Sequence, residues 1–214
     1  MIRSLLILGC LSLCFPALDS TAQNRTHTIA DDSLRKTKER LIAHIQQLHH
    51  TDVVGLFPQL MAVCPVVAFT IPCIPPVGAW DHNRLSSQFG WRLHPIQGRY
   101  RHHEGIDIAG PHQFVRSTAS GTVIKAGYER GLGLYVIVDH GNSYQTTYGH
   151  LALISCKIGQ ELRIGEALGV LGRTGSATGL HLHYAVRKSG QYLNPAAYLT
   201  IGLNVVARYQ SANP

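Results

Sequence analysis

Two short segments carry histidine and aspartate at spacings that suit a metal site. His181 and His183 are separated by one leucine in an otherwise apolar stretch. On extended backbone their imidazoles would emerge on the same face, because the side chains of a strand alternate between its faces. In the segment HEGID (residues 103–107), His103 and Asp107 share a face by the same alternation, and Gly105 leaves room for an ion. The two imidazoles at 181 and 183 can bind one metal together, or one can bind while the other works beside it.

A third segment, residues 144–150, supplies one more histidine. With a period of two, His150 would lie on the same face as Tyr144, Thr146 and Tyr148. Each of the three segments alone is weak evidence, because a His-x-His strand is more often a polar edge than a site. Together they offer two histidines and a carboxylate, the donors that catalytic zinc prefers beside an open position for water. Two further histidines are then left over for proton transfer and transition-state stabilisation.

The elements that must position these residues are short strands. After about Gly78 the sequence consists of β-like runs separated by glycine-containing turns. Strands spaced every dozen or so residues, without helical periods between them, favour an antiparallel sheet or sandwich. We expect a turn at residues 140–142, and His112 and His140 both fall in predicted turns. The expected strands are residues 121–126, 134–139, 143–150, 166–172 and 181–187.

The first part of the chain has a different texture. Residues 33–50 have the apolar spacing of an amphipathic helix, and polar residues at 31–33 are suited to cap its start. Residues 63–76 are apolar but contain four prolines, which exclude a continuous helix and predict an extended connector. Two interpretations stay open: a spacer or packing segment, which we favour, or a prosegment that covers the site.

Five stretches of the second half resemble the lysostaphin-type (LytM-like) zinc metallopeptidases. They are SQFGWRLHP (87–95), HEGIDIA (103–109), TTYGHL (146–151), GRTGSATGLHLHY (172–184) and NP (194–195), and they occur in the order that this family has. The resemblance spans about Pro75 to Leu199. It implies a mainly β protein, an antiparallel sheet or sandwich with a substrate groove, preceded here by a short N-terminal helical segment. It also implies zinc-dependent hydrolysis of peptide bonds in bacterial peptidoglycan, in stem-peptide crosslinks or in crossbridges.

Carried over residue by residue, the resemblance implies that His103, Asp107 and His183 bind Zn²⁺. His150 and His181 would be the catalytic pair, and the sequence does not decide which of them is the general base. Because all five positions are filled, we favour an active enzyme.

The alternative is a catalytically silent cell-wall-binding regulator of the same fold, since some members of the family have lost their ligands. A cupin-like metal protein fits less well, because no ligand-type glutamate follows the HLH segment at cupin spacing.

Two departures from the family pattern concern the substrate: Ala185 stands where glutamate is common, and residues 111–114 replace the usual turn. Arg92 could serve substrate binding or an internal salt bridge, and we favour the structural role.

Composition limits the partners. The chain has 214 residues, a formal net charge of +7 and 13 histidines. Its basic residues are scattered, and no aromatic residues interleave with the densest basic cluster, at residues 35–40. This pattern argues against nucleic-acid binding, whereas attraction to a polyanionic surface such as the cell wall fits it. We expect a monomer.

Residues 1–22 read as a secretory signal peptide, with a positive start, an apolar run and small residues before the cleavage point. The run is too short for a stable membrane span. A lipid anchor at Cys10 is a minority interpretation. We therefore expect export to the periplasm, the cell envelope or the exterior. In that oxidising setting Cys64 and Cys73 could close a small loop.

The expected organisation has four parts. A signal peptide at 1–22 is followed by a helix and proline-rich connector at 23–73. The metallopeptidase domain spans 74–199, and a tail covers 200–214.

Overall fold

The computed structural model describes residues 50–78, 84–93, 98–199 and 201–202, together with residues 32, 35–37, 39, 40, 43–45 and 47. The chain divides into two compact units, Met1–Glu39 and Arg40–Pro214. The expected signal peptide with Cys10, and the tail from residue 203 onward, lie outside the described residues. Within the described part of the chain, no helix is long and apolar enough to cross a membrane.

Helices precede the sheet. The described residues between 32 and 47 are helical, as the sequence predicted for 33–50. Helix α2 (His50–Val63) was not predicted, although it buries Val53, Phe57, Leu60 and Met61 at helical spacing. Pro58 lies inside it, and such a proline ordinarily argues against a helix. The short helix α3 (Pro65–Ala68) starts with proline at its first turn, where the missing N–H costs least. No continuous helix spans 63–76, as expected.

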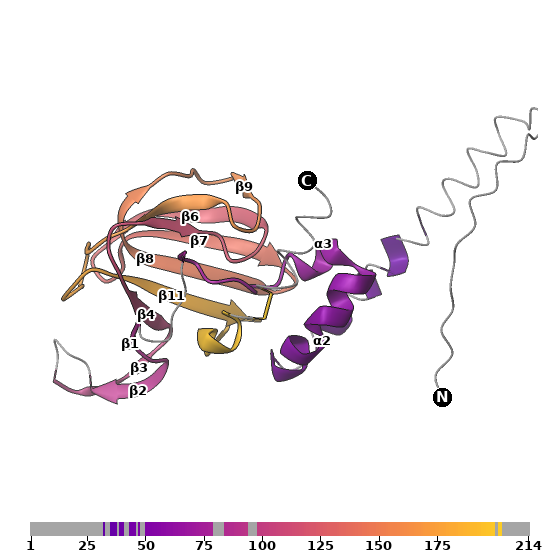
Figure 1. Ribbon diagram of the computed structural model, residues 1–214, viewed down its shortest axis with the longest axis horizontal. Coiled ribbons are helices and arrows are strands. Elements are labelled where there is room, and N and C mark those ends of the chain that lie inside the picture. Colours follow the sequence, from indigo (N-terminus) through magenta and orange to yellow (C-terminus); the bar gives the residue numbers. More distant parts are fainter. Residues whose placement is uncertain are drawn as a thin grey trace, which may run out of the picture. The chain divides into compact units, whose positions relative to one another are not determined.

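The rest of the described chain is mainly antiparallel β-sheet, which confirms the expected fold class (Figure 1). The strands are β1 (Leu85–Ser87), β2 (Gly90–Leu93), β3 (Tyr100–His103), β4 (Ile106–Ala109), β5 (Phe114–Arg116), β6 (Gly121–Glu129), β7 (Gly133–Gly141), β8 (Tyr144–Ile154), β9 (Glu161–Leu162), β10 (Ala167–Leu171), β11 (His181–Lys188) and β12 (Gln191–Leu193). A short 3-10 turn, η2 (Pro195–Ala197), follows. The five predicted strands correspond to β6, β7, β8, β10 and β11.

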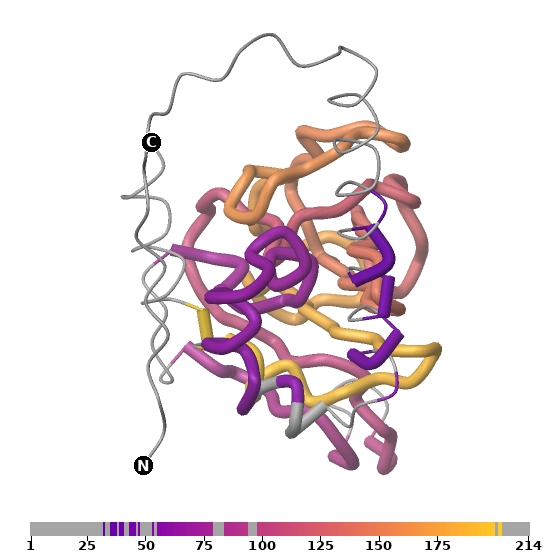
Figure 2. Tube along the Cα trace, turned by 90° about the vertical axis from the view of Figure 1, so that its right-hand side faces the viewer, coloured from indigo at the N-terminus to yellow at the C-terminus, as the bar shows by residue number. Residues whose placement is uncertain are grey.

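One large sheet places distant segments side by side. Its main path runs β1-β4-β11-β8-β7-β6-β9, with β12 beside β11 and with β10 between β8 and β5. Strands β4 and β11 are adjacent although they are far apart in the chain, as the magenta and yellow traces of Figure 2 show. Strands β2 and β3 form a separate two-stranded ribbon.

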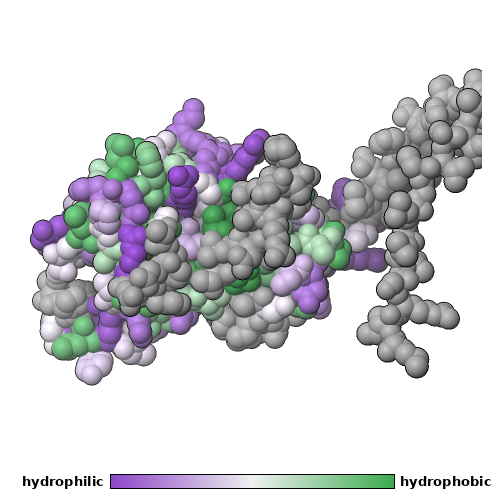
Figure 3. All heavy atoms as spheres, in the orientation of Figure 1, coloured by the Kyte–Doolittle hydropathy of each residue, from purple (hydrophilic) through white to green (hydrophobic). Residues whose placement is uncertain are grey.

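The core lies behind one face of this sheet. Tyr148 and Tyr184 are opposite each other on β8 and β11, and both are fully buried. The hydroxyl of Tyr184 donates to Thr118 Oγ1, which also lies 3.0 Å from the Tyr148 hydroxyl, so these buried polar groups are satisfied. On the face that Figure 3 shows, hydrophilic and hydrophobic side chains are interspersed over the sheet.

His140 contradicts the expectation of a turn. It lies on β7, is 2% exposed, and its Nδ1 donates to the carbonyl of Ser120. Its Nε2 faces the Thr146 hydroxyl at 2.7 Å. The turn is displaced to Asn142 and Ser143, which both adopt positive φ. Burial lowers the pKa of His140 to about 4.

The possible Cys64–Cys73 disulfide is absent, because both cysteines are free. Cys64 is the residue between helices α2 and α3. Cys73 is buried in the connector, and its N–H donates to the carbonyl of Thr118. Burial raises the pKa of the Cys73 thiol, so it remains protonated and packs as a small apolar group.

The prediction of an extended connector at 63–76 was wrong for its first part, because α3 occupies Pro65–Ala68, and the rest of the connector is neither helix nor regular strand. The connector is part of the fold. The carbonyl of Phe69 accepts from Ser120 N, and the carbonyl of Pro76 accepts from Arg116 N. Lys188, at the end of β11, is buried and donates from Nζ to the carbonyl of Ile45 in the helical segment. Within the unit Arg40–Pro214, Ile45 and the connector therefore contact the β-sheet.

Candidate metal centre

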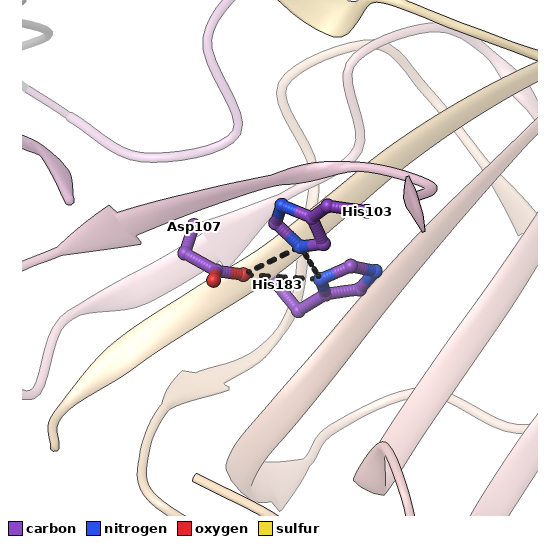
Figure 4. Close-up of side chains that lie close together, drawn as sticks. All are labelled: His103, Asp107 and His183. Atoms are coloured by element: carbon purple, nitrogen blue, oxygen red, sulfur yellow. Dashed lines mark hydrogen bonds and ion pairs between the residues drawn. The ribbon is translucent and has the colours of Figure 1, made fainter. Parts of the chain in front are cut away.

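Three side chains from two neighbouring strands and one ribbon converge on a single point (Figure 4). Asp107 and His183 are direct partners in the pairing of β4 with β11, and His103 is the last residue of β3. His183 Nδ1 lies 3.1 Å from Asp107 Oδ1 and 3.1 Å from His103 Nε2. His103 Nε2 lies 3.2 Å from Asp107 Oδ1.

These separations fit a tetrahedral ion. Ligand atoms about 2.0 Å from a zinc ion at tetrahedral angles lie about 3.3 Å from one another. The three donor atoms are 3.1–3.2 Å apart, and two nitrogens with one carboxylate oxygen are a donor set that zinc accepts. The residues therefore fit a metal ion bound by three protein donors, with a fourth position left for another ligand.

The role expected for Gly105 was wrong in its detail. The chain turns between His103 and Ile106 instead of remaining extended. A Cβ at position 105 would lie 2.5 Å from the carbonyl oxygen of Tyr184 and 2.9 Å from Cε1 of His183. Glycine thus makes room for the strand and ring beneath it.

Neighbouring groups orient the three donors. His103 Nδ1 is 2.8 Å from the carbonyl of Gln88, so Nδ1 carries the proton and Nε2 is free to bind a metal. Arg92 Nη2 lies 3.4 Å from Asp107 Oδ2, which is the internal salt bridge that we expected. Burial acts to raise the pKa of Asp107, but the adjacent imidazoles of His103 and His183 outweigh it and hold the pKa well below its usual range.

His150 reaches the site by a different route from the one predicted. Tyr144, Thr146 and Tyr148 share the buried core face of β8, so uninterrupted alternation would also point His150 into the core. Instead, the β7–β8 register shifts near residue 150, and His150 adopts a φ of 59°. This bulge turns the imidazole toward the opposite face.

The two remaining histidines form a pair beside the donors. The ring centroids of His150 and His181 are 4.6 Å apart, and the His150 ring is 6.0 Å from that of His183. His150 Nδ1 contacts the carbonyl of Thr174 at 2.8 Å, and His181 Nδ1 contacts that of Gly179 at 2.9 Å. Both contacts place the proton on Nδ1 and leave Nε2 free to accept a proton. Burial, followed by the charge of His181, lowers the pKa of His150 to about 4.

Thr174 was missed by the sequence analysis. Its hydroxyl accepts from Leu134 N at 2.9 Å and donates to the carbonyl of Leu151 at 2.7 Å, so it holds the bulge from both sides. In the sequence, the feature that could have indicated Thr174 is its position between Arg173 and Gly175. Gly175 has a φ of 71° and packs against the backbone of Gly133.

The structure thus brings together all five residues that the sequence singled out. Three are mutual neighbours at metal-binding distances, and two are histidines that face the same point with accepting nitrogens. The three donors form a candidate metal site, and the two histidines beside it have nitrogens that can accept a proton.

Comparison with known proteins gives the family. The model of Peptidase family M23 matches residues 101–195, which contain all five site residues. The catalytic domain of the M23 protein EnpA from Enterococcus faecalis is 30% identical, with a TM-score of 0.50 over 58% of this chain and 96% of that domain. The chain belongs to the M23 peptidase family.

Two curated relatives are similar over the same region. The DD-carboxypeptidase/endopeptidase Mpg of Neisseria meningitidis serogroup B is 43% identical over 117 residues, which are 54% of this chain and 27% of that protein. The peptidoglycan DD-endopeptidase ShyC of Vibrio cholerae is 38% identical over 117 residues, again 54% of this chain and 27% of that protein. The chain therefore spans about a quarter of the length of these relatives.

Proposed function

We propose that this chain is a zinc-dependent endopeptidase that hydrolyses peptide bonds in bacterial peptidoglycan. The observation that carries the proposal is the cluster of three donors 3.1–3.2 Å apart, flanked by the His150–His181 pair. Two relatives that share this domain are named as endopeptidases, which supports the same reaction class.

A zinc ion bound by His103, Asp107 and His183 would polarise the scissile carbonyl and bring the pKa of a bound water to about 7. His150 is the residue we assign to accept the water proton, because it is neutral above its pKa of about 4 and its Nε2 is free. His181 Nε2 lies 3.9 Å from Asp107 Oδ1, on the side of the pair that faces the donors. We assign His181 to stabilise the negative charge that develops on the substrate oxygen.

The test uses purified peptidoglycan and the release of new amino groups. The metal-loaded chain should release them, a chelator should stop the release, and added zinc should restore it. His183→Ala should lose both bound zinc and hydrolysis, whereas His44→Ala, which removes an exposed histidine on the helical segment, should retain both. Zinc retention with full activity in His183→Ala would refute the ligand assignment. Peptidoglycan binding without hydrolysis, at full zinc loading, would instead support the silent regulator.

Export and the four-part organisation of the chain are part of the same proposal. An envelope location follows from the substrate, and residues 1–22 would direct the chain there. Residues 23–73 would serve as packing rather than as an inhibitor. In support, Ile45 contacts Lys188, which lies five residues from His183 along β11. At 3.3 Å per residue, this contact is about 17 Å along the strand from the metal donors.

A further inference from the structure

The ribbon of strands β2 and β3 has two unlike faces. Residues that lie directly opposite each other share a face, and the register supplies the pairs Trp91–His102, Arg92–Arg101 and Leu93–Tyr100. Arg92 Nη2 lies 3.4 Å from Asp107 Oδ2, so the face of Arg92 turns toward the metal donors. Because side chains alternate along a strand, Trp91, Leu93 and Tyr100 turn the other way.

The face that turns away is apolar and exposed. Trp91 and Tyr100 are each 74% exposed, and Leu93, which adjoins both, is 59% exposed. The Trp91 ring stands edge-on to that of His102, with the centroids 5.7 Å apart, and this contact leaves most of the indole in solvent. The ribbon projects from the large sheet beyond β1 (Figure 1). Single exposed apolar side chains are ordinary, but adjoining ones on a projecting element mark a binding surface. We call Trp91, Leu93 and Tyr100 the apolar ribbon face.

The charge around the apolar ribbon face has one sign. Residues 84–103 contain four arginines and neither aspartate nor glutamate. Arg99 and Arg101, on either side of Tyr100, are exposed. Such a surface is complementary to the interface of an anionic bilayer, where indole and phenol rings lie at the level of the headgroups and arginines attract acidic headgroups. An uncharged sugar chain would use the aromatic rings but not the arginines, so the charge favours lipid.

We propose that the apolar ribbon face binds the surface of an anionic lipid bilayer, with Arg99 and Arg101 on acidic headgroups. The metal donors stay outside the bilayer in this arrangement, because Arg92 and His103 belong to the opposite face of the ribbon. The contact is peripheral, since it uses a two-stranded ribbon and no spanning segment. The inference does not depend on the proposed peptidase activity.

The first experiment is cosedimentation of the full chain with phosphatidylcholine vesicles, with and without phosphatidylglycerol. An arginine near an anionic surface contributes about fivefold to the partition constant, so two of them predict binding about tenfold or more tighter to the anionic vesicles. The double variant Trp91→Ser/Leu93→Ser should lose about tenfold of this binding, and Arg101→Gln about fivefold. Two matched controls should bind as the wild type does: Tyr128→Ser, at a 65% exposed tyrosine of β6, and Arg163→Gln, at an exposed arginine outside the ribbon.

A second readout is confined to the ribbon, because the apolar run within residues 1–22 also favours lipid. The chain has two tryptophans, so Trp80→Phe leaves Trp91 as the only one. Anionic vesicles with brominated acyl chains should quench the fluorescence of Trp91 and shift its emission to shorter wavelength. The same quenching, present in the wild type and lost in Trp91→Ser, gives the answer without Trp80→Phe.

Three outcomes overturn the proposal. The first is equal binding to the two kinds of vesicle, and the second is unchanged binding of Trp91→Ser/Leu93→Ser. The third is cosedimentation without quenching of Trp91, which would show that the chain binds lipid elsewhere. If the double variant loses binding to purified peptidoglycan and keeps vesicle binding, the face serves the cell wall and the lipid assignment is wrong. Unfolding midpoints equal to that of the wild type show that the variants are folded, as expected for substitutions at exposed positions.

Discussion

Acidification should destabilise this fold through His140. Burial lowers the pKa of His140 from 6.5 to about 4 in the folded chain, partly offset by its hydrogen bond to Ser120. Between these values the unfolded chain binds a proton that the folded chain does not, so stability falls as pH falls. The contribution is fully present above pH 6.5 and is lost as pH drops through about 4. A shift of this size corresponds to about 3 kcal/mol, at about 1.4 kcal/mol per pH unit.

The assay is urea unfolding at several pH values from 4 to 7.5, with a chelator present so that metal release does not add to the slope. His140→Gln keeps an N–H for the carbonyl of Ser120 but cannot take up a proton in this range. Its stability should depend less steeply on pH than that of the wild type, by about 1.4 kcal/mol per unit between pH 4 and 6.5. His44→Gln, at an exposed position, should follow the wild-type curve. Parallel curves for the wild type and His140→Gln would refute the reasoning.

Three further predictions concern the site. Thr174→Val leaves Leu134 N and the carbonyl of Leu151 without their partner, which should cost about 1–3 kcal/mol and lower kcat more than it changes KM. Thr174→Ser should restore both, and an unchanged kcat in Thr174→Val would show that the hydroxyl does not position His150. Gly105→Ala should destabilise the fold by about 1–3 kcal/mol and weaken zinc binding, because the added Cβ would lie 2.5 Å from the carbonyl oxygen of Tyr184. Gly127→Ala, where the added Cβ meets no atom within 4 Å, is the control. Equal unfolding midpoints for the two variants would contradict the clash. Zinc at a thousandfold excess over its Kd should raise unfolding stability by about 4 kcal/mol in the wild type and not in His183→Ala, as measured by thermal unfolding with and without chelator.

The sequence was sufficient where function depends on residue type and local alternation. His181 and His183 share a face of β11 because they follow regular strand alternation, and such alternation can be read along one segment. The strands β6, β7, β8, β10 and β11 were predicted for the same reason. Their residues alternate, and glycines separate them. The register that sets Asp107 opposite His183 could not be read that way.

Where partners distant in the chain decide the conformation, the sequence misled. His150 was expected on the face of Tyr148, but its N–H bonds to the carbonyl of Leu132 and its ring to that of Thr174, and these contacts set the bulge. His140 looked like a turn residue beside glycine, yet its burial depends on Ser120 and on Thr146 of the neighbouring strand. Such pairings have no signature within the segment itself.

The connector has one more consequence, for solubility. Strand β5 pairs with β10 on one side, and its other side is met by Pro76, whose carbonyl accepts from Arg116 N, and by a bridge between Val77 and Val115. Unpaired strand edges invite association with other chains, and proline lacks the N–H with which to extend a sheet outward. The connector therefore closes an edge along which two copies could join. A chain that begins near Ile74 would lose the neighbouring anchors at Phe69 and Cys73, so its tendency to aggregate has to be measured before its activity is interpreted as release from inhibition.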